Sequence, residues 1–530
     1  MAAKVAIPEY AATALEVIPV VASNTRATFR SHKTKNVQWR ITQLRKLYWA
    51  VEDYKAELAA ALQKDLHKSE FEAVLSEIDW VKNQCLWMIA HVEQFAKDDK
   101  LGAPFVPATF SMMKFRVKKE PLGAVLIIGP YNYPVQLVLD PFIAAIAAGC
   151  TAVVKPSELC VATAMVIKDM IEKRLDPNAF AVVTGGIPET EALLNEKWDK
   201  IYFTGSAQVG TIIAKKAAET LTPVCLELGG RNPAFVTKNA NLKLAARRLM
   251  WGKCLNAGQV CVSHNYVLID KGSTAAFIEQ LKATYKDMFP KGAKASPDLA
   301  RIVNPRHFQR LKKMLDETRG KIVMGGELDE SELFIEPTAV LVDSLDDSMM
   351  KEESFGPIFA IYSVHSLDQA LAVASSVHRT PLALYTFGSK AENKKVLHEM
   401  TSGGATVNDS FFHGSVGTVP FGGVGDSGIG QTHGKAAFDS FTHQRTVAET
   451  PGWAEVILRV RYMPYDWGQL RFLQRMTGKK PNFDRNGHVV KGLGYWLAFL
   501  AGLGASGAKG ALLRWIVLLA SGYWYQSRRA

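Results

Sequence analysis

Short apolar runs alternate with helical stretches through the middle of the chain, and this alternation restricts the fold more than any other feature. The runs lie at residues 124–129, 152–154, 179–184, 201–204 and 224–228, with helical stretches at 135–148, 161–173, 189–196 and 209–220. Strands separated by helices form βαβ units, whose parallel sheet is covered on both faces. A second series follows over residues 229–407. We predict an α/β fold of two doubly wound parallel-sheet domains, with the active cleft between them.

Composition places the chain among ordinary globular proteins. Its 530 residues, 48% hydrophobic and 22% charged, suit two or three domains. The six cysteines form no C-x-x-C pair and no Cys/His cluster, so we expect neither a disulfide framework nor a metal site. Of the net charge of +12, most lies in residues 451–530, which hold twelve basic and three acidic side chains. The charge therefore indicates a membrane partner for this tail and no nucleic acid.

Seven short motifs follow one another along the chain. They lie at residues 129–134 (GPYNYP), 154–158 (VKPSE), 203–206 (FTGS), 226–233 (LELGGRNP), 256–261 (NAGQVC), 353–357 (ESFGP) and 420–428 (PFGGVGDSG). Each alone is a weak signal, because a lone cysteine is usually a small buried hydrophobe. In this order and spacing they resemble the aldehyde dehydrogenase superfamily over roughly residues 26–447. The Lys-Pro-Ser-Glu motif and the stretch 461–465 (RYMPY) are most similar to the class 3, fatty-aldehyde branch.

The resemblance implies a catalytic set of three residues. Cys261 matches the nucleophile, whose thiolate attacks the aldehyde carbon to give a thiohemiacetal and then an acyl-thioester. Asn132 matches the amide that stabilises the oxyanion, together with the backbone N–H of Cys261. Glu227 matches the general base of hydrolysis. Whether Glu353 assists it is left open, and the other five cysteines are expected to be structural.

The resemblance also implies a nicotinamide cofactor held by seven residues. Gly205, Ser206 and Gly210 are expected at the pyrophosphate, where a helix begins. Lys155 and Glu158 match the binders of the adenosine ribose, and Glu353 and Phe355 match those of the nicotinamide end. A glutamate at the ribose repels a 2′-phosphate, so NAD is favoured, although NADP remains possible in this branch.

Two features have a competing interpretation. The run Gly423–Gly428 fits the pattern G-x-G-x-x-G, but no clear strand precedes it, and we do not expect it to be a phosphate loop. Relatives usually have Ala-Pro-Asp-Tyr after the nucleophile, where this chain has Ser-His-Asn-Tyr. His264 in that run is either a base or, as we favour, a loop residue beside the site.

The expected organisation has five parts. Residues 1–24 are an extension without an assigned role, 25–228 the NAD-binding domain and 229–419 the catalytic domain. By resemblance, residues 420–450 form an oligomerisation segment, to which residues 105–120 contribute, and the protein is a homodimer. Residues 451–530 are a basic, apolar tail.

The tail contains two apolar runs. Residues 492–508 carry no charge and residues 515–525 are rich in aromatic side chains. About 20 apolar residues are needed to span a bilayer, so the first run is marginal and the second is short. We predict an anchor on membrane lipid that spans once or dips as a hairpin. An interfacial helix pair and a soluble packing tail are the alternatives.

These features together predict a membrane-anchored NAD(P)-dependent enzyme that oxidises medium- or long-chain aliphatic aldehydes. The alternatives are an aromatic or isoprenoid-derived aldehyde at the same membrane, and a catalytically idle scaffold that keeps the fold. The branch resemblance implies a body facing the cytosol at the endoplasmic reticulum. The mitochondrial outer membrane, lipid droplets and peroxisomes are alternative locations.

Overall fold

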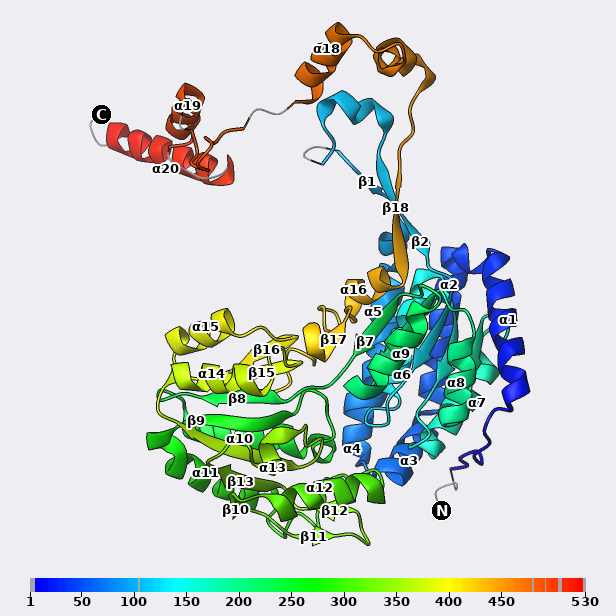
Figure 1. The fold of residues 1–530 in the computed structure, drawn as a ribbon, viewed down its shortest axis with the longest axis vertical. Coiled ribbons are helices and arrows are strands. Elements are labelled where there is room, and N and C mark those ends of the chain that lie inside the picture. The colour runs from blue at the N-terminus through cyan, green and yellow to red at the C-terminus, as the bar shows by residue number, and fades with distance from the viewer. Residues whose placement is uncertain (1–4, 103–104, 479–480, 491, 504–507, 528–530) are drawn as a thin grey trace. The chain divides into compact units, whose positions relative to one another are not determined.

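The computed structural model describes residues 5–102, 105–478, 481–490, 492–503 and 508–527 (Figure 1). The chain divides into two compact units, the larger from residues 1–99 and 117–446 and the smaller from residues 100–116 and 447–530. The larger unit contains the two large sheets, and every predicted site residue lies in it.

The first sheet has six strands in the order β17-β7-β6-β3-β4-β5. Five are parallel neighbours: β3 (Ala124–Ile128), β4 (Thr151–Lys155), β5 (Phe180–Val182), β6 (Lys200–Thr204) and β7 (Val224–Glu227). The edge strand β17 (Gly428–Ile429) pairs with β7 in the antiparallel sense. The predicted parallel sheet is confirmed, with one antiparallel edge that the apolar runs did not predict.

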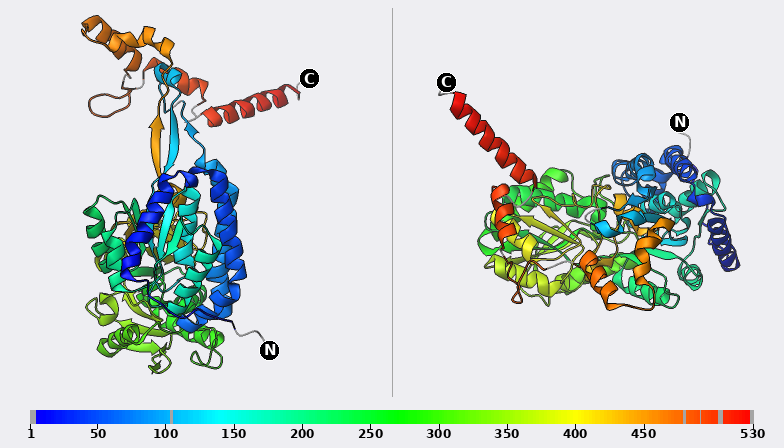
Figure 2. Two further views of the ribbon diagram at one scale, coloured as in Figure 1. Left: turned by 90° about the vertical axis from the view of Figure 1, so that its right-hand side faces the viewer. Right: turned by 90° about the horizontal axis from the view of Figure 1, so that it is seen from above.

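Alternate residues of β3 pack into different apolar clusters, as the period of a strand requires. Ala124, Leu126 and Ile128 pack with residues of α1 (Ile18–Arg30), α8 (Ile187–Asn195) and α9 (Ala207–Ala218). Val125 and Ile127 pack with α6 (Gln136–Ala148), α7 (Val161–Arg174), α2 (Val37–Asp53) and α5 (Asp79–Ala96). Helices therefore cover both faces of this sheet, and the blue N-terminal helices lie beside its cyan strands in Figure 2.

The N-terminal region is helical. The elements are α1, α2 (Val37–Asp53), α3 (Lys55–Leu66), α4 (Glu70–Ala73), the π-helical segment η3 (Val74–Ile78) and α5 (Asp79–Ala96). Part of the predicted extension belongs to α1, where Ile18 and Ala22 are buried against the first sheet. This part of the extension is a packed element of the larger unit.

The second sheet has seven strands in the order β10-β13-β14-β9-β8-β15-β16. All neighbours are parallel except β10 (Lys321–Met324), which pairs antiparallel with β13. The others are β8 (Asn232–Val236), β9 (His264–Asp270), β13 (Thr338–Val342), β14 (Ile358–Val364), β15 (Ala383–Phe387) and β16 (Gly404–Val407). A short hairpin, β11 (Leu328–Asp329) with β12 (Phe334–Ile335), stands apart from it.

Helices also line both faces of the second sheet. One apolar cluster contains residues of α10 (Leu242–Cys254) and α11 (Thr274–Met288). The other contains residues of α12 (Pro305–Glu317), α13 (Ser348–Lys351), α14 (Leu367–Val377) and α15 (Lys390–Glu399). The chain passes from the first sheet to the second between Glu227 and Asn232, where the predicted boundary at 228/229 falls.

A third sheet has three strands in the order β1-β2-β18. These are β1 (Asp99–Lys100), β2 (Arg116–Pro121) and β18 (Thr442–Val447), preceded by α16 (Gly434–Ser440). Strands β2 and β18 come from the two regions predicted to form the oligomerisation element, whereas β1 lies outside both of them. The role of this sheet in assembly stays a prediction.

The smaller unit contains the tail, with helices α17 (Glu455–Leu458), α18 (Trp467–Thr477), α19 (Leu493–Ala501) and α20 (Ala508–Ser527). In the described part of the chain, no helix is both long enough and apolar enough to cross a membrane. Most of the predicted run 492–508 is the nine-residue helix α19, and its residues 504–507 lie outside the described residues. The predicted membrane-spanning tail therefore has no support in the described residues, because the second run belongs to a helix that also contains Lys509 and Arg514.

Candidate active site

The loop that carries Cys261 has a strained backbone. The short 3₁₀ segment Leu255–Gly258 leads into it, and three successive residues, 256–258, have φ values of 48°, 50° and 70°. A side chain at Gly258 would place its Cβ 2.2 Å from the carbonyl oxygen of Gly356, so only glycine fits there. Such left-handed conformations persist where the surrounding structure holds them, as at many active sites.

The thiol of Cys261 lies close to two acidic side chains. Burial, followed by the carboxylates of Glu353 and Glu227, raises the pKa of this thiol to about 12. The structure therefore brings these three predicted residues together. Because a thiol with a raised pKa is protonated at neutral pH, the nucleophile needs a base to take its proton.

Glu227 ends strand β7 and is almost completely buried, with 5% of its surface exposed. Among the described residues, neither of its carboxylate oxygens has a hydrogen-bond partner. Burial raises its pKa well above the usual value. A carboxylate with a raised pKa accepts a proton near neutral pH, which suits a general base.

Asn132 lies in the loop between β3 and α6 and is buried. Its side-chain amide donates a hydrogen bond of 3.0 Å to the carbonyl oxygen of Gln259, two residues before Cys261. An asparagine amide has two N–H donors, and this contact uses one of them. The predicted oxyanion donor is thus attached to the loop of the nucleophile.

Glu353 approaches the backbone of the motif that follows Glu227. A Cβ on Gly229 would lie 2.4 Å from Oε2 of Glu353, so glycine makes room for this carboxylate. Burial raises the pKa of Glu353 to about 7, although the backbone N–H of Gly230, Lys253 and Arg310 act to lower it. Glu353 is therefore a second acid that changes charge near neutral pH beside Cys261.

Lys253 is a neighbour of the site that the sequence analysis missed. It is buried in α10, and its ammonium donates to the carbonyl oxygen of His264 at 2.7 Å and lies 3.3 Å from the hydroxyl oxygens of Ser263 and Ser354. Burial lowers its pKa to about 7. Its place in the sequence, eight residues before Cys261, was the only signal available.

Lys155 and Glu158 form an ion pair of 2.8 Å at the carboxyl end of β4. Partial burial acts to raise the pKa of Glu158, but Lys155 outweighs it and the pKa is lowered. Glu158 is thus ionised at neutral pH and able to accept hydrogen bonds from hydroxyl groups.

Gly205 and Ser206 lie where strand β6 gives way to helix α9. Ser206 is the N-cap of this helix, and its hydroxyl accepts from the backbone N–H of Val209 at 3.3 Å. Gly210, one turn further, faces Leu228, which a Cβ would approach to 2.7 Å. The three residues stand at a helix N-terminus, which favours anions through its unpaired N–H groups and its dipole.

Phe355 follows the second acid and has a φ of 46°. The centroid of its ring lies 5.8 Å from that of Tyr131, in the loop of Asn132. Phe355, which is predicted to hold the nicotinamide end, therefore contacts the loop of Asn132, the predicted oxyanion donor.

The two competing interpretations of the sequence become clearer in the structure. His264 is buried in β9 with its ring 5.0 Å from that of Phe359, and burial lowers its pKa well below the usual value. It lies in a strand, not in the loop we favoured. Asn265 accepts from the backbone N–H of Ser354 at 2.6 Å and holds the segment next to Glu353.

The run Gly423–Gly428 leads into the antiparallel strand β17, and no helix follows it directly.

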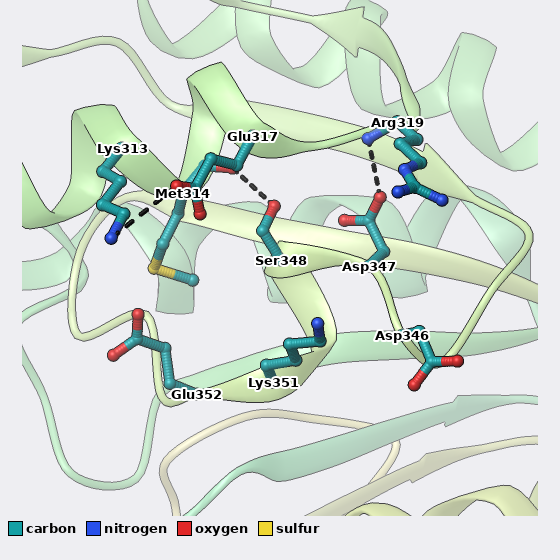
Figure 3. A pocket seen from close by; sticks show the side chains of 9 residues that line it. All are labelled: Lys313, Met314, Glu317, Arg319, Asp346, Asp347, Ser348, Lys351 and Glu352. Carbon is teal, nitrogen blue, oxygen red and sulfur yellow. Dashed lines mark hydrogen bonds and ion pairs between the residues drawn. The ribbon is translucent and has the colours of Figure 1, made fainter.

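A hollow of about 270 Å³ lies elsewhere on the second-sheet half of the larger unit (Figure 3). Three of its charged side chains have partners: Lys313 is 3.7 Å from Glu317, and Asp347 accepts from the backbone N–H of Arg319 at 2.8 Å. No predicted site residue lines it. The convergence around Cys261 is therefore the candidate reaction site.

Comparison with known proteins identifies the family of this chain. The model of the aldehyde dehydrogenase family matches residues 3–447. The chain belongs to the aldehyde dehydrogenase family. It is an enzyme that oxidises aldehydes with NAD or NADP, which sets aside the alternative of an idle scaffold.

Individual relatives of this aldehyde dehydrogenase cover nearly its whole length. It is 69% identical to the beta-apo-4'-carotenal oxygenase of Neurospora crassa over 100% of both chains. It is 39% identical to aldehyde dehydrogenase family 3 member A2 of Mus musculus over 88% of this chain and 95% of that one. The solved substrate-bound state of Staphylococcus aureus AldH has a TM-score of 0.83 and 38% identity, covering 86% of this chain and 99% of the other. Its relatives thus include family 3 members, in agreement with the predicted class.

Proposed function

We propose that this aldehyde dehydrogenase oxidises long, apolar aldehydes of isoprenoid origin to carboxylic acids, with Cys261 as nucleophile, Asn132 as oxyanion donor and Glu227 as general base. The observation that carries the roles is the convergence of Cys261 with two buried acids that have raised pKa values. The class of substrate rests on the full-length identity to an apocarotenal oxygenase.

Proton removal from Cys261 comes first in the proposed mechanism. Glu227 accepts the thiol proton, because its own raised pKa makes it basic enough at neutral pH. The sulfur then bonds to the aldehyde carbon, and the π electrons of the carbonyl move to its oxygen. One amide N–H of Asn132 and the backbone N–H of Cys261 stabilise the resulting oxyanion.

The residues present fit a nicotinamide dinucleotide. Buried Oγ1 of Thr204 and Oε1 of Glu353 have no partner in the described structure, so each is available to a ligand. Gly205 and Ser206 would hold the pyrophosphate, Lys155 and Glu158 the adenosine ribose, and Glu353 and Phe355 the nicotinamide end. When bound, the cofactor supplies the acceptor for the hydride that leaves the thiohemiacetal carbon.

Hydrolysis of the acyl-thioester completes the reaction. Once Glu227 has passed the thiol proton to bulk water, it takes a proton from the attacking water as the water oxygen bonds to the acyl carbon. The carbon–sulfur bond then breaks to release Cys261 as a thiolate, and the proton on Glu227 returns to this sulfur. Asn132 stabilises the oxyanion of this step as well. The carboxylic acid carries one oxygen from the aldehyde and one from water.

NAD is the proposed cofactor. Glu158 is ionised and partly exposed, so it accepts from ribose hydroxyls and repels a 2′-phosphate. Lys155 beside it would attract that phosphate, so exclusion of NADP is expected to be incomplete.

Fatty aldehydes are the second candidate substrates. The tail exposes apolar side chains on α19 and α20, such as Leu497, Leu500 and Leu519, at 59%, 65% and 65%. An enzyme with such a tail meets aldehydes that partition into lipid, whatever their origin. The 39% identity to aldehyde dehydrogenase family 3 member A2 also supports this candidate, because the sequence resembles the fatty-aldehyde branch of class 3.

The substrate class is tested with purified full-length enzyme. NADH formation is measured with an apocarotenal, with hexadecanal and with benzaldehyde, each beside Cys261→Ser as the blank. A kcat/KM for the apocarotenal at least tenfold above that for hexadecanal is expected, and the reverse order would replace the isoprenoid assignment with the fatty one.

The tail is proposed to bind the surface of a membrane with the enzyme body on the cytosolic side, at the endoplasmic reticulum. In α18, Trp467 and Phe472 are 76% and 48% exposed beside the basic residues Arg471 and Arg475. Exposed aromatic and basic side chains on one helix suit an interface with anionic head groups.

Carbonate extraction distinguishes a surface tail from a spanning one. We expect alkaline carbonate to release the intact protein from membranes that retain it at neutral pH, whereas retention in carbonate would indicate a span.

Imaging a fluorescent full-length fusion against organelle markers tests the location, and a mitochondrial, lipid-droplet or peroxisomal pattern would replace the endoplasmic reticulum.

A homodimer is also proposed. Strand β18 is an edge of the three-stranded sheet, and its residues 443–446 are exposed. An open edge of this kind offers unpaired backbone groups to a second copy. Light scattering after size exclusion is expected to give twice the chain mass of 58.3 kDa, and a monomer mass would reject the proposal.

A further inference from the structure

We infer that Lys68 and Glu77, a completely buried ion pair outside the catalytic motifs, are positioning residues that hold Asn132 in place for the reaction. The inference rests on the proposed role of Asn132 as the oxyanion donor. Neither residue belongs to the seven motifs, and both come from the helical N-terminal region.

The pair lies in the protein interior, where burying a charge is energetically costly. Both side chains are 0% exposed, and Nζ of Lys68 lies 2.5 Å from Oε1 of Glu77. Apolar residues of similar volume are often as stable as a buried ion pair, so stability alone is a weak explanation for this one. Glu77 also lies in the π-helical segment η3, and such segments are frequent at functional sites.

The two charges hold both ends of one loop. Nζ of Lys68 donates to the carbonyl oxygen of Asn132 at 3.3 Å and lies 4.1 Å from the centroid of the Tyr133 ring. Oε2 of Glu77 accepts from the backbone N–H groups of Val135 at 2.8 Å and Gln136 at 3.3 Å, where α6 begins. The position of residues 132–136 is therefore tied to a single ion pair.

The loop is connected from this pair to the nucleophile. The carbonyl oxygen of Asn132 also accepts from the side-chain amide of Asn256 at 2.7 Å, and the amide of Asn132 donates to Gln259. Asn256 and Gln259 belong to the strained loop before Cys261. Lys68 and Asn256 thus hold the backbone of Asn132 from two sides while its side chain contacts the catalytic loop.

A third acid determines how the pair has to be tested. Glu72 is buried near Lys68, and burial raises its pKa to about 7 while Lys68 and the backbone N–H of Asn256 act to lower it. Removing Lys68 alone would leave Glu77 without its partner, and removing Glu77 alone would leave Lys68 near Glu72. Both single changes disturb the charge balance, so the two residues are best neutralised together.

The test variant is Lys68→Met with Glu77→Gln. Glutamine keeps a side-chain oxygen for the N–H of Val135, so the start of α6 is preserved while the contact to Asn132 is lost. We expect kcat to fall about 10-fold to 100-fold, since small misplacements of an oxyanion donor cost rates of this order. KM for NAD and for the aldehyde is expected to stay within twofold, which separates positioning from a general loss of structure.

A cycle of variants shows whether the pair acts through Asn132. If it does, adding Asn132→Ala to the paired variant makes it no slower than Asn132→Ala alone. Two results would overturn the inference and leave the oxyanion role intact. In one, the effects of the paired variant and of Asn132→Ala on kcat multiply. In the other, the paired variant keeps wild-type kcat although Asn132→Ala is slow. Wild-type kcat in Asn132→Ala would overturn the proposed oxyanion role and the inference with it.

Two further variants guard against trivial explanations. Lys200→Met removes another buried lysine, whose Nζ bonds Ser440 at 2.7 and 2.9 Å, and it should lower the urea midpoint without changing kcat. If the paired variant fails to fold, Lys68→Arg keeps the charge but displaces the contact to Asn132. Lys68→Arg is expected to lower kcat several-fold with unchanged KM. The same cycle with Asn132→Ala then decides whether it acts through Asn132. An unchanged kcat in Lys68→Arg would contradict the inference.

Discussion

Glu227 and Glu158 both follow the carboxyl ends of strands in the first sheet, yet their surroundings are opposite. Glu227 is 5% exposed and has no hydrogen-bond partner among the described residues, and its pKa is raised. The side chain of Glu158 is 42% exposed and paired with Lys155, and its pKa is lowered. The same functional group is therefore placed in one site to exchange protons and in the other to remain charged.

The difference shows how one sheet edge serves two tasks. A carboxylate that works as a base must be unstable enough in its charged form to take a proton, and burial without partners provides this. A carboxylate that recognises hydroxyl groups must stay ionised, and a neighbouring lysine provides that. Substitutions at the nucleophile and at the two carboxylates should separate these roles.

Removing the nucleophile should have the largest effect. If Glu227 serves the chemistry of Cys261, then Cys261→Ala should lower the rate of NADH formation by about 10⁴-fold or more, because the remaining residues form no covalent intermediate. Cofactor affinity, measured by fluorescence titration, should stay within twofold. Cys254→Ala, a neighbouring thiol in α10, is the control and should keep most of the activity. Substantial turnover by Cys261→Ala would mean that the acids around it serve another reaction.

Replacing the buried acid should come next. Glu227→Gln is expected to lower steady-state turnover by about 10²-fold to 10³-fold, the usual contribution of a general base. If hydrolysis is the step most affected, an acyl-enzyme accumulates and shows as a mass increase on Cys261. Comparison with Glu353→Gln decides which of the two acids is the main base. Full turnover by Glu227→Gln together with a slow Glu353→Gln would transfer that role to Glu353.

The pH dependence of turnover should follow the raised pKa of Glu227 and not the lowered pKa of Glu158. Glu227 acts when ionised, so turnover should rise with pH up to its raised pKa, about 10-fold per pH unit below it, and then level. Because the folded-state pKa is raised, the contribution of Glu227 to stability is present below the unfolded-state pKa and lost as pH rises through the folded one. Glu227→Gln should therefore gain in urea midpoint relative to wild type as pH increases. An equal change at every pH would indicate that Glu227 is not desolvated in solution.

The strands that hold these acids were predictable because they are buried on both faces. The run 224–228 corresponds to β7 (Val224–Glu227) and the run 152–154 to β4, since a continuous apolar stretch between helices has few other uses. The edges β17 and β10 were not predicted, because they are short and partly exposed, so no apolar run marks them. The predicted tail span has no support in the described residues, because uncharged composition does not determine where a helix ends.

The reaction site was predicted by resemblance more than by pattern. Cys261 and Glu227 are 34 positions apart in the sequence, and nothing in their spacing shows that their side chains meet. Lys68 and Glu77 were missed for a related reason: a lysine and a glutamate in an amphipathic helical region look like a solvated face. Their importance arises from burial against a loop more than fifty residues away, which a sequence pattern does not contain.

The smallest effect is expected at the exposed carboxylate. Glu158→Gln removes a charged acceptor of ribose hydroxyls, so KM for NAD should rise about threefold to tenfold, in line with the loss of one hydrogen bond to a charged group. Loss of its charge also leaves Lys155 free to attract a 2′-phosphate, so the ratio of kcat/KM for NADP over NAD should increase while kcat with NAD stays within twofold. Glu172→Gln is the matched control, because Glu172 is 41% exposed and also paired with a lysine, Lys168, but lies within α7 away from the motif. Equal changes in both variants would mean that the Lys155–Glu158 pair stabilises the fold and does not select the cofactor, and the contrast with Glu227 would then be one of burial alone.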